Sequence, residues 1–269
     1  MIHFSHGNSF PAETYHQVIK GLGKSGFEVG YISCLGHNPE YPVADTWESL
    51  VEELIEYITT HYNEKIIAVG HSLGGVISYW ACLKRPDLFK AIILLDAPIY
   101  SSMKYFMINL VKYLGLVDYF TPAPNTKNRR YYWNNHQEAM DHFTNKQVFK
   151  NFDPRCLRDY VYFGTEEIKN EKGKLAHVKL RFDPLIEWKI YRTISMARYK
   201  TKVLAHNIPC GLLYGELSKV VSDKDANYMA KNYNIEPYKI TKGGHLFPFE
   251  QPEATVTAII DFLAKHNIS

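Results

Sequence analysis

A serine between two glycines is the first residue in the sequence whose setting suggests chemistry. Residues 70–74 read Gly-His-Ser-Leu-Gly, after the apolar run KIIAV and before GVISYWACL. The pattern G-x-S-x-G between a strand and a helix is typical of a sharp turn that presents a nucleophilic serine, and its glycines leave room for a strained backbone. The N-terminus of the following helix favours negative charge that develops beside it. We therefore predict that Ser72 is a catalytic nucleophile.

A serine nucleophile needs a base that takes its proton, and that base is usually a histidine. The stretch YKITKGGHLFPFEQPE places His245 after two glycines, just beyond an expected strand and before the C-terminal helix. Of the 12 histidines, only His245 is placed in this way. His71 lies inside the serine turn, and we interpret it as a structural neighbour. The sequence thus predicts His245 as the general base.

Cleavage of an acyl bond also needs two donors for the oxyanion of the tetrahedral intermediate. The backbone N–H of Leu73, directly after the nucleophile, is the expected first donor. The second is expected in FSHGNSF, the loop after the first strand, where His6 and Gly7 allow a tight turn and the N–H of Asn8 can point inward. We predict an oxyanion hole formed by Asn8 and Leu73.

These residues require a scaffold that brings strand ends together, and the sequence predicts one. Short apolar runs typical of buried parallel strands alternate with helical patterns, which is the signature of a doubly wound α/β sheet. The clearest helix is DTWESLVEELIEYI, with Asp45 as expected N-cap and Glu48 three residues later. The expected strands are 2–5, 29–34, 65–70, 91–96, 211–215 and 237–240.

The alternation stops between about Tyr100 and His206, where Tyr, Phe, Lys and Arg are frequent and no equally strong strand is evident. We predict a core of residues 1–100 and 205–269, and an inserted, mainly helical cap of residues 101–204. Residues 101–200 carry 18 Lys and Arg against 10 Asp and Glu, although the whole chain has a net charge of only +3. This excess most simply indicates a basic solvated surface.

Composition excludes several classes of function. No motif of nucleic-acid recognition is present, and no apolar run reaches the roughly 20 residues that span a bilayer. We expect no export signal, because the sequence shows no basic and apolar leader pattern before the first strand. The 4 cysteines are far apart without a C-x-x-C pair. This spacing argues against a zinc site or a disulfide framework. We expect a cytoplasmic protein without a metal or an organic cofactor; its oligomeric state is not indicated.

The order of these motifs resembles the α/β-hydrolases. HGNSF, GHSLGG, LLDAP and GGHLFPFEQPE occur in that family's order and spacing, and the resemblance covers about residues 1–100 and 205–269. It implies an α/β-hydrolase fold and a Ser–His–acid triad with Ser72 and His245 in the first two roles. Most members have two further N-terminal strands, so we expect a mostly parallel sheet of about six strands.

The third triad residue is open at this point, because Ser218 stands where most members of the family have the aspartate. Asp96 ends the strand after the nucleophile helix, and some members, lipases among them, take the acid from that strand end. Glu216 is an alternative acid, as are two residues expected in the first turn of a helix, Asp223 and Asp225. We favour Asp96, because only a carboxylate at the C-terminal edge of the sheet can reach His245.

A serine at this turn indicates acyl transfer to water, since related enzymes that open epoxides or cleave haloalkanes use an aspartate. We predict a serine hydrolase that cleaves a carboxylic ester or related acyl bond through an acyl-enzyme. Thioester and carbon–carbon bond hydrolysis are alternatives, as is a hydrolase fold kept only for binding a ligand. The aromatic cap suits a small-molecule substrate with an apolar moiety. If the basic excess lines the entrance, anionic substrates are favoured.

Overall fold

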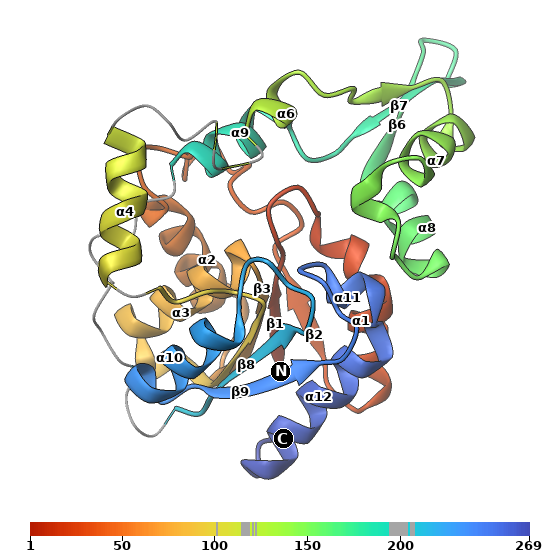
Figure 1. The fold of residues 1–269 in the computed structure, drawn as a ribbon. Coiled ribbons are helices and arrows are strands. Elements are labelled where there is room, and N and C mark those ends of the chain that lie inside the picture. Colours follow the sequence, from red (N-terminus) through yellow and green to blue (C-terminus); the bar gives the residue numbers. More distant parts are fainter. Residues whose placement is uncertain (101, 114–118, 120, 122, 194–203, 205–207) are drawn as a thin grey trace.

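The computed structural model describes residues 1–100, 102–113, 119, 121, 123–193, 204 and 208–269. Its centre is a six-stranded sheet in the order β2-β1-β3-β4-β8-β9, in which every neighbouring pair is parallel. The expected α/β architecture with a parallel sheet of about six strands is therefore confirmed (Figure 1). The strands are β1 (Ile2–Ser5), β2 (Val29–Tyr31), β3 (Ile66–His71), β4 (Phe89–Leu95), β8 (Cys210–Gly215) and β9 (Glu236–Ile240).

Helices cover both faces of this sheet. Successive side chains of a strand point to opposite faces, and here both sets are apolar and need to be covered. Ile66 and Ala68 of β3 pack into one apolar cluster, whereas Ile67 and Val69 pack into the other. The first cluster is covered by α2 (Glu48–His61), α3 (Leu73–Lys84) and α10 (Asp223–Tyr233). The second is covered by α1 (His16–Lys24) and α12 (Pro252–Lys265). Short helical turns are η1 (Ala12–Tyr15), η2 (Pro86–Leu88) and α11 (Phe247–Glu250).

Helix α2 begins later than the sequence predicts. It starts at Glu48, Trp47 occupies the N-cap position, and no side chain caps the helix, so the expected N-cap role of Asp45 is wrong. The reason is tertiary: Trp47 is buried and its indole Nε1–H donates to the carbonyl of Ile190, 3.1 Å away. This contact fixes the chain one residue before the helix and leaves Asp45 exposed.

Between β4 and β8 the chain leaves the sheet, and we call this part the inserted segment. It contains more helix than strand, but it also has a three-stranded antiparallel sheet of order β5-β7-β6, which the sequence did not indicate. Residue 101 and residue 205, the predicted boundaries, lie outside the described residues. The segment's elements are α4 (Ser102–Tyr113), α6 (Ala123–Lys127), β5 (Tyr132–Trp133), α7 (His136–Thr144), η3 (Gln147–Phe149), α8 (Pro154–Phe163), β6 (Thr165–Lys169), β7 (Leu175–Leu180) and α9 (Pro184–Arg192).

Apart from α4, which stands beside the core, the described elements of the inserted segment lie beyond the carboxyl ends of the central strands (Figure 1). In Figure 1 they stand at the opposite end of the sheet from the N-terminus, where β1 begins. Hydrogen bonds attach the segment to the core at separate points. Gln17 of α1 donates to Asp159 of α8 (2.6 Å), and the Arg181 guanidinium donates to Ser33 (2.9 Å). The predicted site residues follow the carboxyl ends of the strands, and the inserted segment therefore faces them.

Candidate active site

Ser72 lies between the end of β3 and the start of α3 in a strained backbone conformation. Its φ is 51° and its ψ is −116°, in the region that non-glycine residues rarely adopt. The flanking glycines are required by space. A Cβ on Gly70 would lie 2.5 Å from the Gly75 nitrogen, and a Cβ on Gly74 would lie 2.2 Å from the Ser5 carbonyl oxygen. The backbone thus has the geometry of the turn that the G-x-S-x-G pattern predicts.

Asp96 and His245 are joined by a hydrogen bond. The His245 Nδ1 lies 2.7 Å from Asp96 Oδ2, and because a carboxylate accepts, Nδ1 carries the proton and Nε2 is left free as a base. Asp96 is fully buried and has a φ of 46°, and its Oδ1 accepts the Gly215 amide at 3.1 Å. Within the part of the chain that the structure describes, no hydrogen bond joins the Ser72 hydroxyl to His245. Such bonds often tighten only when substrate binds.

Ser218, which stands at the usual position of the acid, contacts the same carboxylate. Its Oγ donates to Asp96 Oδ2 at 2.5 Å and accepts the Val220 amide at 3.0 Å. The serine cannot carry negative charge, but it donates a second hydrogen bond to the oxygen that holds His245. The residue at the usual position of the acid therefore contacts Asp96, the predicted acid.

The alternative acids are engaged elsewhere. Glu216 Oε2 accepts the Lys242 amide at 2.8 Å, Asp223 pairs with Lys239, and Asp225 forms a capping box with Ser222 at the start of α10. Their hydrogen bonds serve a loop and a helix end rather than the His245 ring.

One carboxylate near His245 was missed by sequence reasoning. Glu250 of α11 accepts the amide of Gly244, the residue directly before His245. Burial raises the pKa of Glu250, while the Gly244 hydrogen bond lowers it. Its place five residues after His245, at the end of a short helix, is a signal that could have been used. The carboxylate fixes the backbone of the loop that carries His245.

The loop after β1 has its peptide groups held in one orientation. The Gly7 carbonyl accepts from His6 Nδ1 (2.8 Å) and from the Phe10 amide (3.2 Å). In a trans peptide the carbonyl and the following N–H point in opposite directions, so the Asn8 N–H points away from these two donors. The Leu73 N–H is the first of α3, where an amide has no acceptor within its own helix. Both amides thus have the properties that an oxyanion donor needs.

The inserted segment contacts this loop through α9. The Asn8 side-chain amide donates to the Glu187 carbonyl at 3.1 Å, and Ser9 Oγ donates to the Glu187 carboxylate. Glu187 is 3% exposed and pairs with Arg129 at 2.9 Å. Burial raises the pKa of Glu187, and the Arg129 charge opposes this rise. An ion pair of the inserted segment is therefore buried beside the predicted oxyanion loop.

Several large aromatic side chains of the inserted segment are used in packing, within the segment and against the core. Phe149, Phe152 and Tyr160 are buried in one cluster with Phe10 and Phe249 of the core. The Phe152 and Phe249 rings stack at 4.8 Å between centroids. The aromatic content thus attaches the segment to the core, and it is weak evidence for an aromatic substrate.

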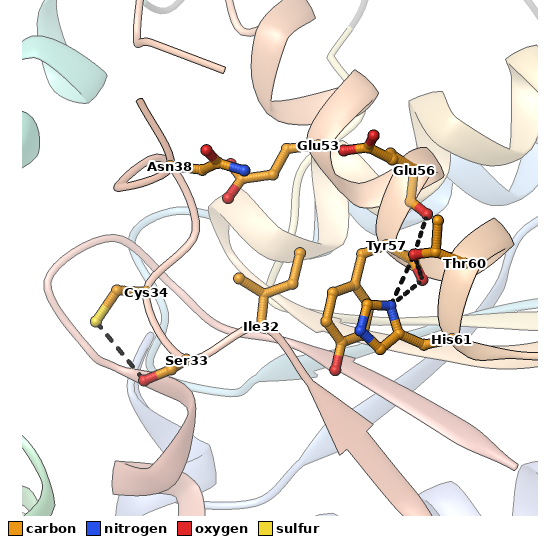
Figure 2. A pocket seen from close by; sticks show the side chains of 9 residues that line it. All are labelled: Ile32, Ser33, Cys34, Asn38, Glu53, Glu56, Tyr57, Thr60 and His61. Atoms are coloured by element: carbon orange, nitrogen blue, oxygen red, sulfur yellow. Dashed lines mark hydrogen bonds between the residues drawn. The ribbon is translucent and has the colours of Figure 1, made fainter. Parts of the chain in front are cut away.

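Two pockets of the described residues lie away from Ser72, Asp96 and His245. One of about 340 Å³ opens between the loop after β2 and helix α2 (Figure 2). Another of about 520 Å³ lies between α1, α8 and α12. Figure 2 shows Cys34 and Ser33 on one side of the first pocket and side chains of α2 on the other. Neither pocket includes a predicted catalytic residue.

Three histidines of the core are buried in a neutral state, and this predicts acid sensitivity. Burial lowers the pKa of His3 to about 3, that of His6 to about 4 and that of His71 to about 3, from 6.5. The unfolded chain then binds more protons than the folded chain below pH 6.5, so stability is lost as pH falls from 6.5 toward 3–4. At pH 5 the loss is roughly 2 kcal/mol per histidine.

We therefore expect the free energy of unfolding, measured by urea titration, to fall steeply between pH 7 and pH 5. His3→Gln replaces one buried histidine by a group that does not titrate. It should therefore reduce the slope of unfolding free energy against pH by the contribution of about one bound proton. Equal unfolding free energies at the two pH values would contradict the neutral buried state.

The described residues contain no group of three or more His, Cys, Asp or Glu side chains arranged to hold a metal ion. None of their helices combines the length and the apolar character that crossing a bilayer requires.

Comparison with known proteins agrees with this fold. Residues 4–258 match the alpha/beta hydrolase family, and the chain belongs to that family. Ethanol acetyltransferase 1 of Kluyveromyces lactis is 35% identical over 75 residues, which are 27% of this chain and 20% of that protein. The match thus spans about a fifth of that relative's length.

Two solved structures are similar over almost the whole chain. E-2-(acetamidomethylene)succinate hydrolase superposes with a TM-score of 0.75 at 19% identity, over 98% of this chain and 91% of that one. An esterase of Mycobacterium tuberculosis superposes with a TM-score of 0.72 at 21% identity, over 98% and 84%. At this identity the superpositions show the fold and no more.

Proposed function

We propose that this α/β-hydrolase is a serine hydrolase that cleaves carboxylic esters by way of an acyl-enzyme. The observation that carries the proposal is the 2.7 Å hydrogen bond between the buried Asp96 carboxylate and His245 Nδ1. It lies at the edge of the sheet that also carries the strained Ser72 turn. A carboxylate that fixes the histidine tautomer next to a strained nucleophile turn is the arrangement that acyl transfer needs.

In the proposed reaction the Ser72 Oγ attacks the substrate carbonyl carbon while His245 Nε2 takes the hydroxyl proton. The Leu73 and Asn8 amides stabilise the oxyanion. The tetrahedral intermediate collapses when His245 returns the proton to the leaving alcohol, which leaves an ester on Ser72. Water, deprotonated by His245, then releases the carboxylic acid. Asp96 accepts the hydrogen bond of His245 Nδ1 and stabilises the imidazolium in both halves.

The hypothesis of a non-catalytic binding protein depended on the serine at position 218. That reason is weakened, because Asp96 contacts His245 and Ser218 donates to Asp96. The resemblance to an esterase and to an ethanol acetyltransferase is consistent with acyl chemistry. Neither name identifies the substrate of this chain.

The proposed substrate is an ester with an apolar acyl group that reaches Ser72 beside the inserted segment, which we propose is a cap. Two arginines of that segment form ion pairs within it, Arg129 with Glu187 and Arg130 with Glu138, and the excess of Lys and Arg over Asp and Glu already counts both carboxylates. If the remaining excess lines the entrance, anionic esters are favoured over neutral ones. The 4 cysteines are free thiols, which supports the proposed cytoplasmic location.

The test is a panel of purified substrates that differ in the acyl bond and in charge. We expect turnover of neutral acyl esters by the wild-type protein and none by Ser72→Ala. Matched thioesters, vinylogous diketones and carboxylated esters identify the preferred bond and charge. If no substrate in the panel is turned over by the wild-type protein, ester hydrolysis is the wrong function.

A further inference from the structure

A line of three hydrogen bonds, two buried and one partly buried, connects the three loops of the candidate site and has no part in the proton transfers described above. The Gly7 amide donates to the Tyr15 hydroxyl at 3.0 Å. That hydroxyl lies 2.7 Å from His71 Nδ1, and His71 Nε2 lies 2.9 Å from the His245 carbonyl oxygen. Tyr15 and His71 are each 1% exposed.

The direction of every bond in this line can be assigned. A carbonyl oxygen only accepts, so His71 Nε2 carries a proton and donates to His245. The buried ring is neutral, since burial lowers the pKa of His71 to about 3. Its Nδ1 must therefore accept, which makes Tyr15 the donor to His71. The Tyr15 oxygen in turn accepts from Gly7, so each of the three bonds has one donor and one acceptor.

Three members of the line are next to, or belong to, a residue that the proposed reaction uses. Gly7 precedes Asn8, the proposed oxyanion donor, and His71 precedes Ser72. The carbonyl at the other end belongs to His245 itself. A shift at any of these backbones would move a reacting group by a similar distance, and misplacements of about 1 Å can cost 10²-fold in rate.

The surroundings hold the Tyr15 oxygen in place. The Tyr15 ring packs against Phe4 (4.7 Å between centroids) and Phe249 (4.4 Å). A Cβ on Gly7 would lie 2.8 Å from His71 Nδ1 and 3.1 Å from the Tyr15 hydroxyl, so this loop is in close contact with both side chains. The line is rigid because its middle member is anchored in the apolar core.

We propose that Tyr15 and His71 are positioning residues that set the spacing between the oxyanion loop, the Ser72 turn and the His245 loop. This inference rests on the proposed serine hydrolase function for its effect on rate. It also predicts that the loops around Gly7 and His245 open more often without the Tyr15 hydroxyl, and this can be measured without any enzyme activity.

The test compares Tyr15→Phe with Tyr62→Phe. The Tyr62 hydroxyl lies 2.9 Å from Nδ1 of another buried histidine, His3, but Tyr62 follows the end of α2, and its ring packs against His3 and Tyr57 rather than against the three loops. We expect Tyr15→Phe to lower kcat about 10- to 100-fold with little change in KM. Tyr62→Phe should keep both constants, and both variants should be folded at the assay temperature.

Amide hydrogen exchange measures the positioning itself. In Tyr15→Phe the amides of residues 6–9 and 243–246 should exchange roughly five- to tenfold faster, which corresponds to the loss of one hydrogen bond. They should exchange at the wild-type rate in Tyr62→Phe. Unchanged exchange in Tyr15→Phe, or equal changes of kcat in the two variants, would overturn the positioning role. If the wild-type protein hydrolyses nothing, the proposed function fails, and hydrogen exchange alone decides whether Tyr15 and His71 position the three loops.

Discussion

Ser72→Ala and His245→Ala should each lower turnover by roughly 10³-fold or more, and the double variant should lose little beyond either single one. Without the Ser72 hydroxyl no acyl-enzyme forms. Without the imidazole the hydroxyl keeps its proton at neutral pH and is a weak nucleophile. The effects do not add because each change disables the same step. Steady-state kinetics on the best ester of the panel measures all three variants.

Ser78→Ala is a matched control for the serine change. Ser78 lies in the same helix, α3, is fully buried, and its hydroxyl donates to Ser5 Oγ at 3.2 Å. The substitution removes the same atom and should leave turnover within a few-fold of the wild-type value. Full activity in Ser72→Ala or in His245→Ala would show that the nucleophile or the base has been assigned incorrectly.

Asp96→Asn should lower kcat on the order of 10²- to 10⁴-fold while the fold is retained, by analogy with the loss of the aspartate in other triads. Asp96 Oδ2 accepts from His245 Nδ1 and from Ser218. An amide nitrogen at that position would donate to the ring and leave the proton on the nitrogen that must act as the base. The negative charge that stabilises the imidazolium would also be lost.

The control for this change is Glu216→Gln. Glu216 is the nearest alternative in the sequence, but its carboxylate accepts the Lys242 amide, and a glutamine oxygen can accept the same bond. We expect Glu216→Gln to change kcat by less than about threefold. The assignment of the acid is wrong if Glu216→Gln is the more damaging of the two substitutions, with circular dichroism used to verify that both variants are folded.

The parts of the fold that follow from local pattern were predictable from the sequence. The strands of the central sheet are short apolar runs, and β3 and β4 differ from the expected ranges by one or two residues. Strand β6 was missed because it is largely exposed and polar, as TEEIK shows. Strand β7, LAHVKL, was missed because only Val178 and Leu180 are buried in it, so it has no continuous buried apolar run. The expected N-cap at Asp45 failed because a contact between Trp47 and distant Ile190 decides where α2 begins.

The candidate site divides in the same way. The Ser72 turn is a local pattern of five residues, and His245 is marked by its place after a strand. The contact between Asp96 and His245 spans 149 residues, so sequence reasoning could only rank Asp96 above Glu216. Tyr15 carried no signal, because its bond to His71 spans 56 residues and depends on the packing of two loops. The sequence indicated only that His71 is a structural neighbour of Ser72. Its hydrogen bonds to Tyr15 and to the His245 carbonyl show which groups it contacts.

The central claim is that Ser72 is an activated nucleophile, and covalent labelling tests it most directly. The purified protein is treated with a fluorophosphonate, and intact-mass and peptide mass spectrometry locate the adduct. The account predicts one adduct per chain, on the peptide that contains Ser72, formed much more slowly in Asp96→Asn and absent in Ser72→Ala. No adduct on the folded wild-type protein, or an adduct on a residue other than Ser72, would contradict it.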